Sequence, residues 1–507
     1  MKTKMSLTTI VIVLVIVFFP YVLGWLLQGD FVFSGFLFNP QDGFSYLAKM
    51  RQGWEGSWGF TLPFTSNPGE PVPLFLFYLF LGHLARIFHL SLPVMYGITR
   101  FLSSAFLLFM LWDFLQRTFK EKSPDAQRVF WLLALGGGLG WLVALTSGFL
   151  TGDFWVAETY PFLSMFAAPH FSLGLALILW GDKISTMPFN PLNALGLSII
   201  SLTLGFIQPF GVVILGLWLG IRFLVQGLFQ QNWIPWVRFI PVVPGLLVLF
   251  WQYGLISSHP VLRLWNEQNV TSALPLWDLL VSLSPAVILA VLGGRRAFQR
   301  KDFPFIVVAG WVLGAMVLIY FPFNLQRRFM TGLYIPVGVL AGYGVSAWLG
   351  SRSVLKKWVW RVVWITSFFT PLLVVLSTIG AVFQKDASVY LYPDEVRAFH
   401  WMEQNLPKNA VILAAPQTGL MIPAWTGLRV VYGHPFETVR SDESKQWVEK
   451  FFLGEMTAAE TDVFFRQFNI QYLLIGPREE ALLQGRNPSV GRMVYQTENV
   501  RIFRVEK

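Results

Sequence analysis

Residues 36–77 read FLFNPQDGFSYLAKMRQGWEGSWGFTLPFTSNPGEPVPLFLF, a polar stretch set between two apolar runs. Asn39 and Pro40 lead into a segment whose apolar residues recur at helical spacing, with Asp42 near its start. The spacing predicts a short amphipathic helix that lies flat at a membrane interface, with its acid where water meets lipid. An equally open interpretation makes Asp42 an N-cap that satisfies free backbone N–H groups. The more polar side of the helix carries Asp42, Ser45, Tyr46 and Lys49.

Apolar runs dominate the chain on both sides of this stretch. Of its 507 residues, 54% are hydrophobic and 13% are charged, and the mean hydropathy is +0.55. No soluble fold needs that much apolar surface, and runs near the ~20 residues that cross a bilayer recur up to about residue 383. We therefore expect an α-helical polytopic membrane protein with about 11 spans plus juxtamembrane helices.

Two other features of the composition argue against cysteine-based chemistry and against nucleic-acid binding. Cysteine is absent, so the chain has no disulfide framework, thiol nucleophile or thiolate metal site. The net charge is +10, but Lys and Arg gather in short loops between apolar runs. This distribution indicates orientation in the membrane rather than binding of nucleic acid.

The basic clusters predict which loops are cytoplasmic. They are Lys2 and Lys4; Arg117, Lys120, Lys122 and Arg128; Arg295, Arg296, Arg300 and Lys301; and Arg352, Lys356, Lys357 and Arg361. With all four inside, the N-terminus is cytoplasmic and the tail from about residue 384 is extracytoplasmic.

This orientation requires an odd number of crossings, whereas the chain has about twelve apolar segments. One segment should therefore not cross the membrane. We expect residues 72–90, which carry His83, Arg86 and His89, to form a juxtamembrane or re-entrant helix on the outer side. A miscount in the Pro-interrupted region 191–225 is the alternative.

The tail alternates predicted helices and strands. Helices are expected in 393–407 and near 442–454 and 457–468, and strands in 410–416, 428–433, 470–477 and 500–506. This order favours an α/β domain with a mostly parallel sheet. No glycine-rich phosphate motif follows a strand, so nucleotide binding has no support. We expect a transmembrane domain at 1–385 and a soluble extracytoplasmic α/β domain at 386–507.

The first outer loop resembles that of the GT-C superfamily of polyprenyl-phosphate-sugar-dependent glycosyltransferases, which includes protein O-mannosyltransferases and aminoarabinose transferases. In that superfamily an acidic residue precedes a short helix that ends in an R-Q-G-like turn, and a Pro-containing approach leads to the next apolar helix. The matching residues are Asp42, Tyr46-Leu47-Ala48, Arg51-Gln52-Gly53, and Pro71 to Pro73. Many members carry Asp-Glu where this chain has Asp42-Gly43.

A second match lies at residues 324–344, NLQRRFMTGLYIPVGVLAGYG. It resembles the family's Arg-aromatic segment followed by a Pro-containing span near the substrate phosphate. Arg327 and Arg328 fall on the predicted outer side, against the usual placement of basic residues. The other interpretation is that they snorkel at a span end.

The resemblance implies an inverting glycosyltransferase that moves a sugar from a polyprenyl-phosphate donor to a lipid, glycan or protein acceptor outside the cytoplasm. Asp42 would take the proton of the acceptor hydroxyl, and Arg would stabilise the phosphate leaving group. The expected substrate-binding residues are Arg327, Arg328, Tyr46, Lys49, Arg86, Glu158 and His170. Loop solvation remains an alternative for Asp153 and Glu158, as does a structural hydrogen bond for His170.

No spacing indicates a metal site, although Asp42, Asp153, Glu158 and His170 could together hold a divalent ion. Two other classes of function stay open. A transporter or lipid flippase would show paired midplane charges, internal repeats and unwound helices, and no convincing repeat is present. A membrane-anchored scaffold remains open if Asp42 only caps its helix.

The topology leads to a labelling prediction. A cysteine introduced at Ser441 should react with a membrane-impermeant reagent on intact cells, because the tail is expected outside and the chain has no cysteine of its own. Labelling that requires a broken membrane would defeat this orientation.

Overall fold

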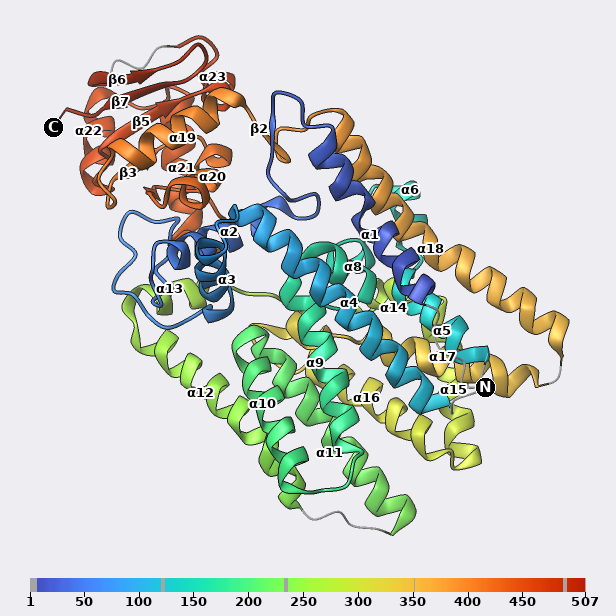
Figure 1. Ribbon diagram of the computed structural model, residues 1–507. Coiled ribbons are helices and arrows are strands. Elements are labelled where there is room, and N and C mark those ends of the chain that lie inside the picture. Colours follow the sequence, from blue (N-terminus) through green and yellow to red (C-terminus); the bar gives the residue numbers. More distant parts are fainter. Residues whose placement is uncertain (1–6, 120–123, 232–235, 351, 487–489, 507) are drawn as a thin grey trace. The chain divides into compact units, whose positions relative to one another are not determined.

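The computed structural model describes residues 7–119, 124–231, 236–350, 352–486 and 490–506 (Figure 1). The chain forms two compact units. Unit 1 comprises Met1–Pro20, Ile98–Trp251 and Thr271–Gly380, and unit 2 comprises Tyr21–Gly97, Gln252–Val270 and Ala381–Lys507. The division predicted near residue 385 stays a prediction.

Unit 1 consists of helices, most of them apolar. They are α1 (Leu7–Leu26, which continues into unit 2), α4 (Leu92–Phe119, which begins in unit 2), α5 (Pro124–Leu135), α6 (Gly140–Ser147), α7 (Gly152–Trp155), α8 (Pro161–Ala167), α9 (Pro169–Ser185), α10 (Pro191–Ile207), α11 (Pro209–Gln230), η1 (Trp236–Val242), α12 (Val243–Ser258, which ends in unit 2), α14 (Leu276–Leu283), α15 (Ala286–Arg300), α16 (Phe303–Ile319), η2 (Gln326–Met330), α17 (Tyr334–Leu349) and α18 (Ser353–Phe383).

Among the described residues, seven helices are long and apolar enough to cross a bilayer. An eighth span results if α14 and α15, which are bent by 86° at their break, count as one. Three shorter apolar helices, α3 (Leu76–Ile87), α10 and α16, fall below that length. The expectation of a multi-pass helical membrane protein is confirmed, and the number of helices that cross stays open between these limits and the predicted ~11.

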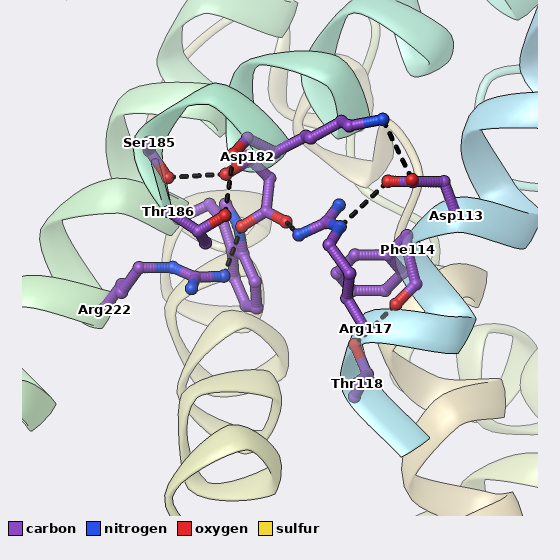
Figure 2. Close-up of polar contacts among 10 residues, drawn as sticks. Asp113, Phe114, Arg117, Thr118, Asp182, Ser185, Thr186 and Arg222 are labelled. Carbon is purple, nitrogen blue, oxygen red and sulfur yellow. Dashed lines mark hydrogen bonds and ion pairs between the residues drawn. The ribbon is translucent and has the colours of Figure 1, made fainter. Parts of the chain in front are cut away.

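A charge cluster joins α4, α9 and α11 within unit 1, as Figure 2 shows. Asp182 is fully buried and accepts hydrogen bonds from Arg117 at 2.7 Å, from Trp218 at 2.6 Å and from Arg222. Arg117 also donates to Asp113 at 2.8 Å. Because a buried charge needs partners, this network fixes the three helices. It lies near the C-terminal ends of α4 and α9 and holds these helices to α11.

Unit 2 contains the amphipathic helix that the sequence predicts. Its helices are α2 (Pro40–Trp54), α3, α13 (Pro260–Gln268), α19 (Pro393–Asn405), α20 (Pro416–Thr426), α21 (Ser441–Phe452), α22 (Ala458–Gln467) and α23 (Pro477–Leu483). With 12 residues, α3 is shorter than the ~20 residues that a crossing requires. This length fits the prediction that residues 72–90 do not cross the membrane.

The crossing of α2 and α3 depends on two glycines. A Cβ added at Gly53 would lie 2.0 Å from the carbonyl oxygen of Leu79, and one at Gly82 would lie 1.9 Å from that of Met50. No side chain fits at either position, so the two backbones approach as closely as their atoms allow. The glycine of the R-Q-G turn is therefore required by packing.

The C-terminal part of unit 2 holds a five-stranded sheet. Its strands are β3 (Val411–Leu413), β4 (Arg429–Val430), β5 (Tyr472–Ile475), β6 (Arg492–Gln496) and β7 (Arg501–Arg504), in the order β4-β3-β5-β7-β6. A separate antiparallel pair joins β1 (Val32–Phe33) to β2 (Tyr390–Leu391). The α/β class is confirmed.

The prediction of a mostly parallel sheet is wrong. β3 runs parallel to β4 and β5, but β7 is antiparallel to both β5 and β6. The sequence pattern missed β6, whose residues are partly or fully exposed and so lack the apolar alternation of a half-buried strand. The sheet is mixed because β7 runs antiparallel to β5 and forms a hairpin with β6.

The α2/α3 crossing gives a stability prediction. Gly53→Ala should lower the unfolding midpoint in detergent, because the added methyl group forces the helices apart at a cost of about 1–3 kcal/mol or more. Gly254→Ala is the matched control, since a Cβ there meets nothing within 4 Å and its helix, α12, tolerates alanine. Equal midpoints in the two variants would show that the crossing adjusts freely.

Candidate functional site

Asp42 lies in the first turn of α2, and side chains hold both of its oxygens. Asn39 Nδ2 donates to Oδ2 at 2.5 Å, and His434 Nε2 lies 3.2 Å from Oδ1. The Asp42 side chain is nevertheless 42% exposed. The N-cap of α2 is Asn39, in the left-handed region with φ 45°, so Asp42 does not occupy the capping position. The carboxylate is oriented and open to an incoming group.

The surroundings of His434 determine its role toward Asp42. The backbone N–H of Phe436 donates to His434 Nδ1 at 3.1 Å. Because Nδ1 accepts, the neutral ring carries its proton on Nε2 and donates it to the carboxylate of Asp42. The His434 side chain is 3% exposed, so the ring is fixed by its packing as well as by its hydrogen bonds.

A short turn presents His434 to α2. We call residues 433–438, GHPFET, the His434 loop. Thr438 Oγ1 accepts from the backbone N–H groups of Gly433 at 3.4 Å and His434 at 3.3 Å. A Cβ at Gly433 would lie 2.6 Å from the carbonyl oxygen of Gly419, so only glycine fits where this loop passes α20.

A buried ion pair ties the same loop to α2. Lys49 Nζ donates to Glu437 Oε1 at 2.6 Å and to Ser45 Oγ at 2.5 Å, and Ser45 donates to Glu437 at 2.7 Å. The ammonium also lies 4.6 Å from the ring centroid of Phe75. Burial alone would raise the pKa of Glu437, but the charge of Lys49 and the hydrogen bonds from Lys49 and Ser45 lower it below its ordinary value of 4.5. Lys49, an expected substrate-binding residue, is thus buried and engaged with Glu437.

Three tyrosines form an aromatic stack near Asp42. The rings of Tyr46 and Tyr78 are parallel within 8° at 4.6 Å, and Tyr96 lies 6.3 Å from Tyr46. Burial raises the pKa of Tyr78 well above its ordinary value, and the charge of Asp42 contributes to that shift. The carboxylate therefore lies within electrostatic reach of the stack. Tyr46, another expected binding residue, is partly exposed there.

The R-Q-G turn at the other end of α2 is structural. Gln52 donates to the carbonyl oxygen of Thr61 at 2.8 Å and accepts from its N–H at 2.9 Å. Arg51 bonds Glu55 at 3.1 Å and also pairs with Glu403 on α19. These contacts hold α2 against the following loop and the C-terminal part of unit 2.

In unit 1, the two expected phosphate-binding arginines have different partners. Arg328 Nη1 lies 3.2 Å from Glu158 Oε1, with the arginine side chain 37% exposed and the glutamate 5%. The Arg327 guanidinium lies over the Trp155 ring at 4.7 Å. Arg328 is thus oriented by a buried carboxylate, whereas Arg327 rests on an aromatic ring.

Two other polar residues singled out from the sequence, Asp153 and His170, make contacts that hold the fold. Asp153 is buried and accepts from the backbone N–H groups of Gly138 at 3.0 Å and Gly140 at 3.2 Å, and from Thr370 at 2.8 Å. The His170 ring packs against Phe171 at the start of α9, with centroids 4.0 Å apart.

Two expectations remain, Arg86 as a substrate-binding residue and a possible metal site. Arg86 is exposed in the last turn of α3. Within the described parts of the chain, no three His, Asp or Glu side chains gather as a metal-binding group.

Sequence reasoning did not identify His434 and Glu437. Their signal was a His-x-x-Glu pair directly after the strand predicted at 428–433, in a loop of the kind that often carries functional groups. Only the folded structure brings this pair to α2.

Comparison with known proteins identifies the fold. No protein-family model matches the sequence, and no curated protein matches it. Among solved structures, the apo oligosaccharyltransferase of Archaeoglobus fulgidus matches with a TM-score of 0.56 at 11% identity, over 94% of this chain and 70% of its own. ArnT from Cupriavidus metallidurans, bound to undecaprenyl phosphate, matches with a TM-score of 0.52 at 12% identity, over 98% of both chains.

A third solved structure is similar over a smaller share of its length. The mycobacterial arabinofuranosyltransferase AftD matches with a TM-score of 0.51 at 12% identity, over 100% of this chain and 40% of its own. These likenesses show that the chain shares the fold of these three solved structures, as the resemblance seen in the sequence predicted.

Proposed function

We propose that this protein is an inverting glycosyltransferase that moves a sugar from a polyprenyl-phosphate donor to an acceptor on the extracytoplasmic side of the membrane. The observation that carries the proposal is the half-exposed carboxylate of Asp42, oriented by Asn39 and His434 within a GT-C fold. The lipid phosphate bound to ArnT and the dolichol-phosphate bound to the Archaeoglobus oligosaccharyltransferase support the donor class.

Asp42 acts as the base. The acceptor hydroxyl transfers its proton to the carboxylate while its oxygen forms a bond to the anomeric carbon. The bond between that carbon and the phosphate oxygen breaks, and its electron pair leaves with the polyprenyl phosphate. One displacement inverts the anomeric centre.

The leaving group needs charge stabilisation rather than a proton. A guanidinium offers two parallel N–H donors to phosphate oxygens. Arg328 suits this role because Glu158 orients it and a third of its side chain remains exposed. Arg327, stacked on Trp155, suits an anchoring role at the span end.

The proposal places the N-terminus in the cytoplasm and residues 386–507 outside, as a soluble domain. The acceptor is a lipid, glycan or protein hydroxyl. The direct test incubates purified protein with a panel of polyprenyl-phosphate sugars and an acceptor extract and follows the release of polyprenyl phosphate. Movement of the lipid between leaflets without release would instead support the flippase alternative.

The base gives a first prediction for activity. Asp42→Asn should lower turnover by on the order of 10²-fold or more, because the amide keeps the shape of the side chain but does not accept a proton at neutral pH. Donor binding and the unfolding midpoint should stay near wild type. Asp30→Asn, which changes an exposed acid that lies before α2, is the control. Unchanged turnover in the Asp42 variant would remove this mechanism.

The arginines give a second prediction, read as kcat/KM for the donor. Arg328→Lys keeps the charge but loses the paired donors, and should weaken transition-state stabilisation by roughly 1.5–3 kcal/mol. Arg327→Lys should be nearly silent. Wild-type kinetics in the double alanine variant would exclude both residues from the phosphate site and leave Arg86 as the next candidate.

A further inference from the structure

We infer that His434, in the C-terminal part of the chain, is a positioning residue for the base Asp42. This inference rests on the proposed function and deepens it. It assigns the region after residue 386 a part in positioning the base. The geometry that supports it is the docking of the His434 loop along one face of α2.

The contacted residues of α2 form a regular row. Asp42, Ser45 and Lys49 follow one another at spacings of three and four, so they lie on one face of the helix. The His434 loop contacts all three, because His434 reaches Asp42 while Glu437 accepts from Ser45 and Lys49. A loop held at Ser45 and Lys49 brings its histidine to the first turn in a fixed register.

A second anchor holds the far end of the loop. Gln268 of α13 donates to the carbonyl oxygen of Thr438 at 2.6 Å and accepts from the N–H of Arg440 at 3.0 Å. The loop is thus held from α2 and from α13, both within unit 2. The C-terminal end of the loop is therefore held by the buried ion pair of Glu437 and, at the next residue, by the amide of Gln268.

The hydrogen bond from His434 to Asp42 fixes the orientation of the carboxylate. Its Nε2–H fixes Oδ1 of Asp42, and Asn39 fixes Oδ2, so the carboxyl plane is set from both sides. Other titratable groups near this end of α2 are Tyr78 of α3, which senses the charge of Asp42, and the ion pair of Lys49 with Glu437. His434 is placed against the carboxylate itself, with its Nε2 3.2 Å from Oδ1.

Two substitutions separate positioning from loop structure. In His434→Asn the side-chain oxygen can still accept from the N–H of Phe436, but no atom reaches Asp42. In His434→Gln the longer amide can donate to Asp42 in place of Nε2. His400→Asn, at an exposed histidine of α19, is the matched control.

We expect His434→Asn to lower kcat by about 10- to 100-fold, the loss of one hydrogen bond to a charged group, with KM for the donor unchanged. The acid limb of its pH–rate profile should move to higher pH, because the donor that favours the ionised carboxylate is gone. His434→Gln should recover most of kcat and the original profile. The Asp42→Asn/His434→Asn double variant should be no slower than Asp42→Asn alone.

The outcomes distinguish this inference from the proposed function. Wild-type kinetics and profile in a folded His434→Asn variant would overturn the positioning role while leaving the transferase intact. Equal losses in the Asn and Gln variants, with an unmoved profile, would likewise overturn it in favour of a purely structural histidine. A wild-type protein that releases no polyprenyl phosphate from any donor would overturn both.

Discussion

The buried pair of Lys49 and Glu437 is the contact on which the arrangement around α2 depends. Its atoms are 2.6 Å apart, and the two side chains are 1% and 12% exposed. Removing charges from water is expensive, and a pair of this kind adds little net stability compared with apolar packing. Losing one partner leaves the other charge buried, which typically costs about 3–5 kcal/mol. The pair therefore selects one docking register for the His434 loop more than it strengthens the fold.

Exposure separates the charged groups that hold the structure from those available for chemistry. Asp182 and Asp153 are fully buried and bonded from several sides, so their hydrogen-bonding capacity serves helix packing and backbone N–H groups. Asp42 and Arg328 are held by neighbours yet keep a substantial exposed surface. The sequence patterns singled out Asp42, Asp153 and Arg328 and passed over Asp182, and they carried no information on the exposure of any of these side chains.

Local sequence patterns predicted the structural features that depend on residues close together in the chain. The amphipathic period of α2, the apolar spans and four of the five strands of the sheet follow from hydrophobic spacing. The contact of His434 with Asp42 joins residues 392 positions apart, and it depends on how α20, β4 and α13 pack, which no short motif encodes. The burial of Lys49 was hidden for the same reason. On an isolated amphipathic helix it belongs to the polar side, and only the docked loop removes it from water.

The charge of the neighbours explains why a neutral histidine suits the position beside the base. A guanidinium or ammonium bonded to Asp42 would hold its carboxylate so firmly ionised that it would accept a proton poorly. Lys49 lies two turns away on the same face of α2, and Glu437 neutralises it there. The His434 loop thus affects the surroundings of Asp42 in two ways, because Glu437 compensates a cation on the same face of α2 while the imidazole supplies an uncharged donor. His434 therefore orients the Asp42 carboxylate without lowering its basicity as a full positive charge would.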